Sequence, residues 1–249
     1  MLCPPISQAE LDARLSGHID ELLELWWAEQ GAPKASELEL IARAIPVPRD
    51  QPIRVLDLCS GPGDVGRAIR RIYPHAGIDC LDRDPFLLSI CAAVNQRAGL
   101  PGRVVRKDLT EAGWVAEISR DYDVVTIVNA LHWFDSQRAA SVVEDVHGLL
   151  RQGGLFILAE PTAPATPFAV GFDEWKATRP PRYTRENWER FWSRANAILG
   201  YDHTRLLGAR QADHSPSVAA WSRLIDRAGF GLIDVLLKDA DQVIIAALK

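Results

Sequence analysis

The segment from Ile53 to Gly66, which reads IRVLDLCSGPGDVG, restricts the fold more than any other part of the chain. It begins with a short apolar run that includes Val55 and Leu56, and such a run closed by glycines is typical of a buried parallel strand. Apolar residues then recur at helical spacing from Val65 to Ile72. A strand, a glycine loop and a helix in this order bring bare backbone N–H groups and a helix N-terminus close to a ligand. The segment therefore predicts an α/β fold with a binding site at the loop.

The charges around this loop indicate which ligand it holds. Gly61, Gly63 and Gly66 fit the spacing G-x-G-x-x-G, which also marks dinucleotide sites. Asp57 ends the strand four residues before Gly61, and the first basic residue is Arg67, already in the helix. A carboxylate at the mouth favours a ligand with positive charge, such as an ammonium and a sulfonium, and disfavours a pyrophosphate.

The run Asp57 to Gly63, DLCSGPG, resembles the first motif of the class I S-adenosylmethionine-dependent methyltransferases, which usually reads D/E-x-G-x-G-x-G. Cys59 stands where the first glycine of that motif normally lies, and this departure reduces the backbone freedom there. The resemblance implies a doubly wound, Rossmann-like α/β fold and S-adenosyl-L-methionine as cofactor. In this loop it implies cofactor contacts from Asp57, Cys59, Ser60, Gly61 and Gly63.

A second acid follows the next expected strand, residues 76–81. Asp82 lies 19 residues beyond Gly63, close to the interval at which doubly wound folds place an acid on a ribose. A carboxylate offers two oxygens to the two ribose hydroxyls. The string DRDP also resembles the second motif of the family, which implies a ribose contact from Asp82 with Arg83 beside it. The alternative is a solvated acid in the turn before a helix at 85–98.

A third short strand is expected at residues 103–106. Asp108 and Leu109 follow it. In the resembled family, an acid just past this strand approaches the adenine amino group, and an apolar neighbour lies against the ring. The resemblance therefore implies that Asp108 and Leu109 contact the adenine.

The run Tyr122 to Val128, YDVVTIV, predicts a fourth strand. In a doubly wound sheet, strands one and four flank the point where the strand order reverses, and ligands bind there. We therefore expect Asn129 and Ala130 to face the cofactor. The following stretch, ALHWFD, resembles small-molecule methyltransferases of the trans-aconitate methyltransferase-like group and differs from the N-P-P-Y motif of methylases that act on nucleic acid bases.

Methyl transfer is an in-line displacement, so the protein must mainly align the reactants and exclude water. A base is needed only if the nucleophile carries a proton at neutral pH, and a carboxylate nucleophile needs none. His132 is the candidate base because it follows the fourth strand; the alternative is a packed histidine that orders the loop. The candidate substrate residues are Trp26, Trp133, Glu160 and Tyr183.

The remaining elements complete a seven-stranded, mostly parallel sheet with additions. Residues 7–30 predict one amphipathic helix ended by Gly31 and Pro33, and a second helix follows at 34–45. Further helices are expected at 136–150, in pieces over 173–201, and at 218–228, with a strand at 155–159 and a closing antiparallel hairpin at 231–237 and 242–248. The expected domains are an N-terminal helical lid (1–48), a cofactor-binding core (49–161), a helical insertion that caps the substrate (162–215), and the last helix and hairpin of the core (216–249).

Composition narrows the functional classes. The chain has 249 residues and a net charge of −5, which disfavours a protein that grips nucleic acid through phosphates. Its four cysteines show no C-x-x-C pair and no zinc spacing, so we expect no metal site. No signal peptide and no apolar run long enough for a membrane span are present, so we expect a cytoplasmic protein without membrane or nucleic-acid partners. The oligomeric state stays open.

The expected function is S-adenosylmethionine-dependent methyl transfer to a small molecule, with an anionic or carboxylate-bearing metabolite as acceptor. The alternative is an enzyme of the same fold that uses the sulfonium for ring closure and releases methylthioadenosine. A dinucleotide oxidoreductase would need a loop without Asp57 and a group that compensates phosphate charge. A nucleic-acid methylase is disfavoured by the acidic composition.

Overall fold

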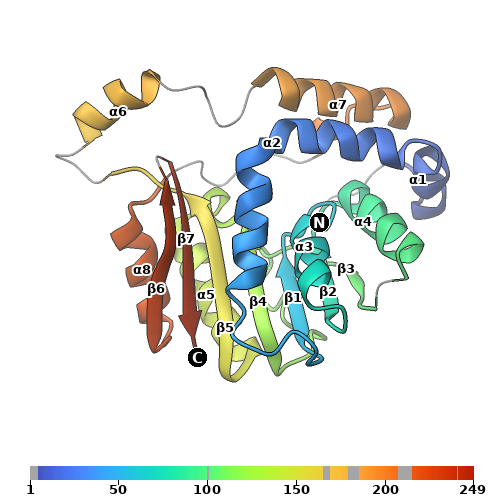
Figure 1. The fold of residues 1–249 in the computed structure, drawn as a ribbon. Helices are drawn as coiled ribbons and strands as arrows, with labels where there is room; N and C mark the ends of the chain where they lie inside the picture. The colour runs from blue at the N-terminus through green and yellow to red at the C-terminus, as the bar shows by residue number, and fades with distance from the viewer. Residues whose placement is uncertain (1–4, 100, 165–168, 179–184, 207–214, 240) are drawn as a thin grey trace.

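The computed structural model describes residues 5–99, 101–164, 169–178, 185–206, 215–239 and 241–249. The strands within these residues form a seven-stranded sheet in the order β3-β2-β1-β4-β5-β7-β6 (Figure 1). The first five strands are parallel, and β7 runs antiparallel to both β5 and β6. This confirms the predicted doubly wound sheet with a closing hairpin. The strands are β1 (Arg54–Leu58), β2 (Gly77–Asp82), β3 (Val104–Arg106), β4 (Tyr122–Val128), β5 (Leu150–Pro161), β6 (Leu232–Asp239) and β7 (Gln242–Leu248).

Helices cover both faces of the sheet. Figure 1 shows α5 and α8 on one face, and α3 with the second half of α2 on the other. The helices are α1 (Gln8–Leu15), α2 (Ile19–Arg43), α3 (Asp64–Ile72), α4 (Pro85–Arg97), α5 (Ser136–Leu149), α6 (Ala169–Ala177), α7 (Arg185–Leu199) and α8 (Val218–Arg227), with 3-10 turns η1 (Leu131–Trp133) and η2 (His203–Arg205).

Alternation along the strands divides the core into two clusters. Leu56 and Val125 face α5 and α8 and pack in the cluster that contains Trp221. Their neighbours Val55 and Val124 face the other way, into the cluster with helices α2 and α3. Because successive strand residues point to opposite faces, a short continuous apolar run serves both clusters. The register pairs Leu58 with Leu81 and with Ile127, so the loops after β1, β2 and β4 leave the sheet at one edge.

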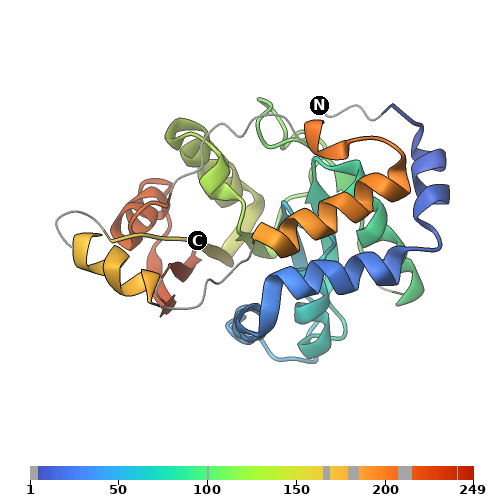
Figure 2. The same ribbon diagram turned by 90° about the horizontal axis from the view of Figure 1, so that it is seen from above.

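A third apolar cluster lies above this edge. It joins α1, the first half of α2, α4 and α7, and includes Leu15, Leu22, Phe86 and Phe191. Figure 2 shows the first half of α2 and α7 side by side above the sheet. These helices lie over the loops at the carboxyl ends of the strands, where the sequence predicts a lid.

The N-terminal helices differ from the prediction. The single helix expected at 7–30 is two, because α1 ends at Leu15 and α2 begins at Ile19. Gly31 and Pro33 do not end a helix, since α2 continues to Arg43 and bends between its two halves (Figure 1). The two halves pack on different partners, the lid and the sheet, and this tertiary packing outweighs the local preference of glycine and proline.

One smaller difference concerns β5. The strand expected at 155–159 begins earlier, at Leu150, and the turn residues before it are part of β5. Helices α6 and α7 confirm that the insertion is helical in pieces. The expected interruption at Pro180-Pro181 falls outside the described residues.

Candidate active site

The loop after β1 is held in a backbone conformation that suits glycine. Cys59, Gly61 and Gly63 all have positive φ, of 54°, 52° and 85°. At Gly63 a Cβ atom would lie 2.8 Å from Sγ of Cys91 on α4, so the close approach of that helix excludes a side chain. Cys59 adopts this left-handed conformation although it carries a side chain. The position therefore has the backbone geometry that glycine adopts most easily.

Asp82 connects this loop to the end of β2. Its Oδ2 accepts the N–H of Gly61 at 2.9 Å, and its Oδ1 accepts the N–H of Asp84 at 2.9 Å. Burial raises the pKa of Asp82 to about 6, and the charge of Asp84 adds to the rise. Its ionised form therefore lacks a compensating cation, which a cationic ligand would supply.

Asp57 lies deeper, at 1% exposure. Its Oδ1 accepts the hydroxyl of Thr126 at 2.8 Å, and its Oδ2 has no hydrogen-bond partner within the described residues. Burial raises the pKa of Asp57 to about 7; the Thr126 hydrogen bond opposes this, and the charges of Asp64 and Asp82 add to it. The Ser60 hydroxyl is also buried without a partner in the described part of the chain. These atoms fit a polar, positively charged ligand at the loop.

A cleft of about 190 Å³ gathers most of the predicted site. Nine of the predicted cofactor residues line it: Cys59, Ser60, Gly61, Asp82, Arg83, Asp108, Leu109, Asn129 and Ala130. Asp57 and Gly63 do not line it and support the loop from behind. Further lining comes from Trp26, Asp84, Leu87, Lys107, Thr110, Trp133, Phe134, Trp188 and Trp192.

The end of the cleft beyond β3 and β4 is built from side chains that hydrogen bonds hold in place. Asp108 is 6% exposed, and its Oδ1 accepts the N–H and hydroxyl of Thr110 at 2.9 and 2.7 Å. Asn129 has a φ of 53°, and its Oδ1 accepts from Gln242 on β7 at 3.0 Å. The hairpin that closes the sheet therefore also fixes a lining residue.

Glu160 lies at the end of β5 and is fully enclosed. Its Oε1 accepts the N–H groups of Ala130 and Leu131 at 2.9 and 2.7 Å, and its Oε2 lies 2.7 Å from Nδ1 of His132. Glu160 does not line the cleft, so this geometry makes it a support for the loop rather than a substrate contact. His132 is 8% exposed and is also outside the lining, with its ring edge-on to that of Trp133.

The roof of the cleft is aromatic. Trp26 meets Phe191 at a ring distance of 5.2 Å, and its Nε1 donates to Oδ2 of Asp64 at 2.6 Å. The next residue, Trp27, donates to the other oxygen of Asp64 at 3.0 Å. We call this arrangement of Trp26, Trp27 and Asp64 the Asp64 clasp. It ties the first half of α2 to the first turn of α3, directly after the glycine loop.

Sequence reasoning expected residues 162–215 to cap the substrate, but it did not assign the cleft residues of α7 or the pairing made by η2. Trp188 and Trp192 line the cleft from α7, and their four-residue spacing on one helix face is a signal that could have been read. His203 is fully buried, and its Nε2 lies 2.9 Å from Oδ1 of Asp84. The two residues lie 119 positions apart in the sequence, so a short sequence pattern could not predict their contact. Of the predicted substrate residues, Trp26 and Trp133 line the cleft, and Tyr183 lies outside the described residues.

The sheet order, the left-handed glycine loop and the acid after β2 define the fold class: a doubly wound, Rossmann-like α/β domain of the methyltransferase fold. Residues 55–154 match the family described as "Methyltransferase domain". Over these residues the chain is similar to methyltransferase domains, in agreement with the resemblance that its motifs show to S-adenosylmethionine-dependent methyltransferases.

A trans-aconitate 2-methyltransferase from Streptomyces avermitilis is 34% identical over 95 residues, which cover 38% of this chain and 34% of that protein. The match thus spans about a third of the relative's length. A putative O-methyltransferase from Nostoc punctiforme has a similar structure, with a TM-score of 0.58 and 20% identity over 86% of this chain and 56% of that one. The structure of human N-acetylserotonin methyltransferase in complex with SAM has a TM-score of 0.57 and 13% sequence identity. The match covers 98% of this chain and 56% of that one. At these identities the structural likeness concerns the fold.

Within the described residues, no three His, Cys, Asp or Glu side chains are grouped so as to hold a metal ion. None of the described helices combines the length and the apolar character that a membrane crossing requires.

Proposed function

We propose that the chain is a methyltransferase that transfers the methyl group of S-adenosylmethionine to a small molecule. The observation that carries this proposal is the cleft at the carboxyl ends of β1, β2, β3 and β4, in which residues from all four family motifs meet. The buried carboxyls of Asp57 and Asp82, with raised pKa values, support a cationic ligand over a dinucleotide.

In this proposal each motif holds one part of the cofactor. Cys59, Ser60 and Gly61 receive the methionine portion at the cleft wall, and Asp57 and Gly63 act from behind the loop, where the Oδ2 of Asp57, which has no partner among the described residues, favours the ammonium. Asp82, with Arg83 beside it, takes the ribose diol, and Asp108, Leu109, Asn129 and Ala130 enclose the adenine side. When bound, S-adenosylmethionine supplies the methyl group and a neutral thioether leaving group.

The chain's own part in the reaction is alignment and exclusion of water. The aromatic roof, with Trp26 and Trp133 as the proposed acceptor contacts, shields the cleft. The Glu160 carboxylate holds the proton of His132 on Nδ1, which leaves Nε2 as the atom able to take a proton from an acceptor. His132 is the proposed base, for an acceptor that needs one. Residues 1–48 would act as lid and 162–215 as substrate cap.

We propose a carboxylate-bearing acceptor. The similarity to a trans-aconitate 2-methyltransferase favours it. A carboxylate acceptor would need no base, so His132 would then serve to order the loop after β4.

The test has two stages. Calorimetry with S-adenosylhomocysteine checks the cofactor site, and absence of binding contradicts the proposal. The protein is then incubated with S-adenosylmethionine and a panel of mono-, di- and tricarboxylates, and products are read by mass spectrometry. A gain of one CH₂ in an acceptor, with S-adenosylhomocysteine as co-product, supports methyl transfer. Methylthioadenosine without a methylated acceptor supports the alternative, a ring-closing enzyme of the same fold.

A further inference from the structure

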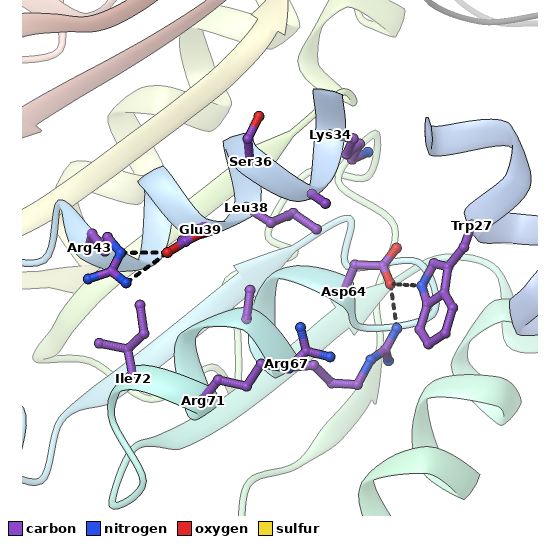
Figure 3. A pocket seen from close by; sticks show the side chains of 12 residues that line it. Trp27, Lys34, Ser36, Leu38, Glu39, Arg43, Asp64, Arg67, Arg71 and Ile72 are labelled. Atoms are coloured by element: carbon purple, nitrogen blue, oxygen red, sulfur yellow. Dashed lines mark hydrogen bonds and ion pairs between the residues drawn. The ribbon is translucent and has the colours of Figure 1, made fainter. Parts of the chain in front are cut away.

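A second concave site lies between the second half of α2 and α3. Figure 3 shows it from close by, with side chains from both helices directed toward it and Trp27 at one end. We call it the α2–α3 groove. Its volume of about 760 Å³ is within the range of small-molecule sites, roughly 300–1,000 Å³. It shares no lining residue with the cofactor cleft.

We propose that the α2–α3 groove binds a small organic anion with a flat ring. The first support is charge. The groove is lined by the cations Lys34, Arg43, Arg67 and Arg71 and by the carboxylates Glu39 and Asp64. The lining is thus positive in a chain whose net charge is −5. A local excess of cations in an acidic protein favours anions at that place.

The second support is that the carboxylates are already engaged. Glu39 accepts from the Arg43 guanidinium at 2.7 Å, and Asp64 accepts from Arg67 and from the two indoles of the clasp. Arg71 makes no ion pair with any residue that the structure describes, and its side chain is exposed. Its planar guanidinium can therefore hold a carboxylate, phosphate or sulfonate through two parallel hydrogen bonds.

The third support is the shape and polarity of the walls. Trp27 is 47% exposed and presents an indole at one end of the groove, and Leu38 and Ile72 add apolar lining. The Arg67 guanidinium lies 5.9 Å from the centre of the Trp27 ring. A flat ring against this indole would bury apolar area while its acidic group reaches the guanidiniums.

The experiment uses the whole chain and 2-naphthalenesulfonate as probe, with its neutral isostere naphthalene-2-sulfonamide as comparison. Titration calorimetry is run with and without saturating S-adenosylhomocysteine. We expect saturable binding of the sulfonate in both conditions and at least about fivefold weaker binding of the sulfonamide, since one charge-assisted contact is worth on the order of 1–2 kcal/mol. Equal binding of both probes, or loss of sulfonate binding with S-adenosylhomocysteine, overturns the proposal.

Variants locate the probe. Arg71→Ala should weaken the sulfonate about fivefold or more, and Trp27→Ala should weaken both probes. The matched control is Arg227→Ala, which removes an exposed arginine from α8, on the opposite face of the sheet (Figure 1). It should leave the dissociation constant unchanged. Unchanged affinity in Arg71→Ala, or an equal loss in Arg227→Ala, contradicts the site. Because both arginines are exposed, neither change should affect folding, and thermal melts check this.

Discussion

The carboxylate of Glu160 lies 2.7 Å from Nδ1 of His132 and, through its other oxygen, accepts the N–H groups of Ala130 and Leu131. One enclosed side chain thus fixes both the backbone of the loop after β4 and the orientation of the imidazole. A carboxylate only accepts hydrogen bonds, so in neutral His132 the ring proton resides on Nδ1.

Replacing Glu160 by Gln should reverse this tautomer. The amide carbonyl can keep the two backbone N–H groups, but its NH₂ group then faces Nδ1, which must accept and so loses its proton to Nε2. Nitrogen-15 NMR of the imidazole should show a pyridine-like Nε2 in the parent and a pyridine-like Nδ1 in Glu160→Gln. The same tautomer in both proteins would contradict the assignment.

Glu160→Ala is the companion change. It leaves several buried donors without an acceptor, and breaking a buried, hydrogen-bonded carboxylate network costs roughly 3–5 kcal/mol of unfolding free energy. Denaturant unfolding should show a loss of this size, and a loss below about 1 kcal/mol would mean that water replaces the carboxylate. The control is Glu189→Ala, which removes the exposed ion pair between Arg185 and Glu189 on α7. It should lower the free energy of unfolding by less than about 1 kcal/mol.

Cofactor binding should release protons near neutral pH. Asp57 and Asp82 have pKa values of about 7 and about 6 against 3.8 for an ordinary aspartate, because they are buried. An approaching cation lowers both values, so protons leave as it binds. Calorimetry of S-adenosylmethionine in two buffers of different ionisation enthalpy at pH 6 should show this release, and affinity should rise from pH 5 to pH 8. Identical heats in the two buffers would argue against protonated carboxyls.

The same shifts make the unliganded fold less stable as pH rises. Between 3.8 and about 7 the folded chain holds more protons on Asp57 and Asp82 than the unfolded chain does, so the free energy of unfolding falls across that window. Asp57→Asn removes the titrating group and can keep the Thr126 hydrogen bond. It should therefore stabilise the unliganded protein at pH 8 while weakening S-adenosylmethionine at least tenfold, as compared by thermal melts and calorimetry.

Cys59→Gly should be tolerated. The substitution removes the strain of a left-handed conformation, which costs about 1 kcal/mol, but it also removes the packing of a small side chain. Because the two effects oppose each other, the free energy of unfolding should change by less than about 1 kcal/mol. Affinity for S-adenosylhomocysteine should be kept. Gly63→Ala is the contrast, because its Cβ would meet Sγ of Cys91 at 2.8 Å on a residue with φ of 85°. Equal behaviour of the two variants would show that the loop relaxes more readily than its geometry indicates.

The Asp64 clasp should control access to the cleft. The cleft volume of about 190 Å³ is below the usual range for small-molecule sites, so we expect the lid to move outward when the cofactor enters. Trp26→Phe removes the hydrogen bond to Asp64 from the indole that lies against Gly61. Trp27→Phe removes the hydrogen bond to Asp64 from the indole that lies outside the cleft. Stopped-flow fluorescence should show faster release of S-adenosylhomocysteine in both. An effect confined to Trp26→Phe would mean that the clasp itself does not hold the lid.

The parts of the site that lie next to a strand end were predictable from sequence. Asp57, Asp82, Asp108 and Asn129 each follow or end an apolar run, and parallel strands bring such positions to one edge of the sheet. The positions of the strands were predictable from apolar runs bounded by glycine and proline, whereas the order of the strands was implied by the resemblance to the family.

The lid was less predictable because its helices are shaped by contacts far apart in sequence. The path of α2 through Gly31 and Pro33 depends on two different packing partners, one in the lid and one on the sheet. The role of Glu160 was also misread, since a position at the sheet edge does not reveal whether a carboxylate turns to the cleft or to the backbone behind it. Tyr183 stays a prediction.

The pairing of His203 with Asp84 bears on how such enzymes could be re-engineered. Asp84 caps α4 two residues after the proposed ribose acid, so the imidazole of His203 ties the segment after α7 to the start of α4. In a chimaera whose residues 162–215 come from another protein and lack this histidine, the buried Asp84 carboxyl would lose its partner. We expect weaker binding of the nucleoside as a result. Grafts that end before Asp202 and keep the native residues from there onward would preserve this pairing, although they would replace the cleft wall that Trp188 and Trp192 supply.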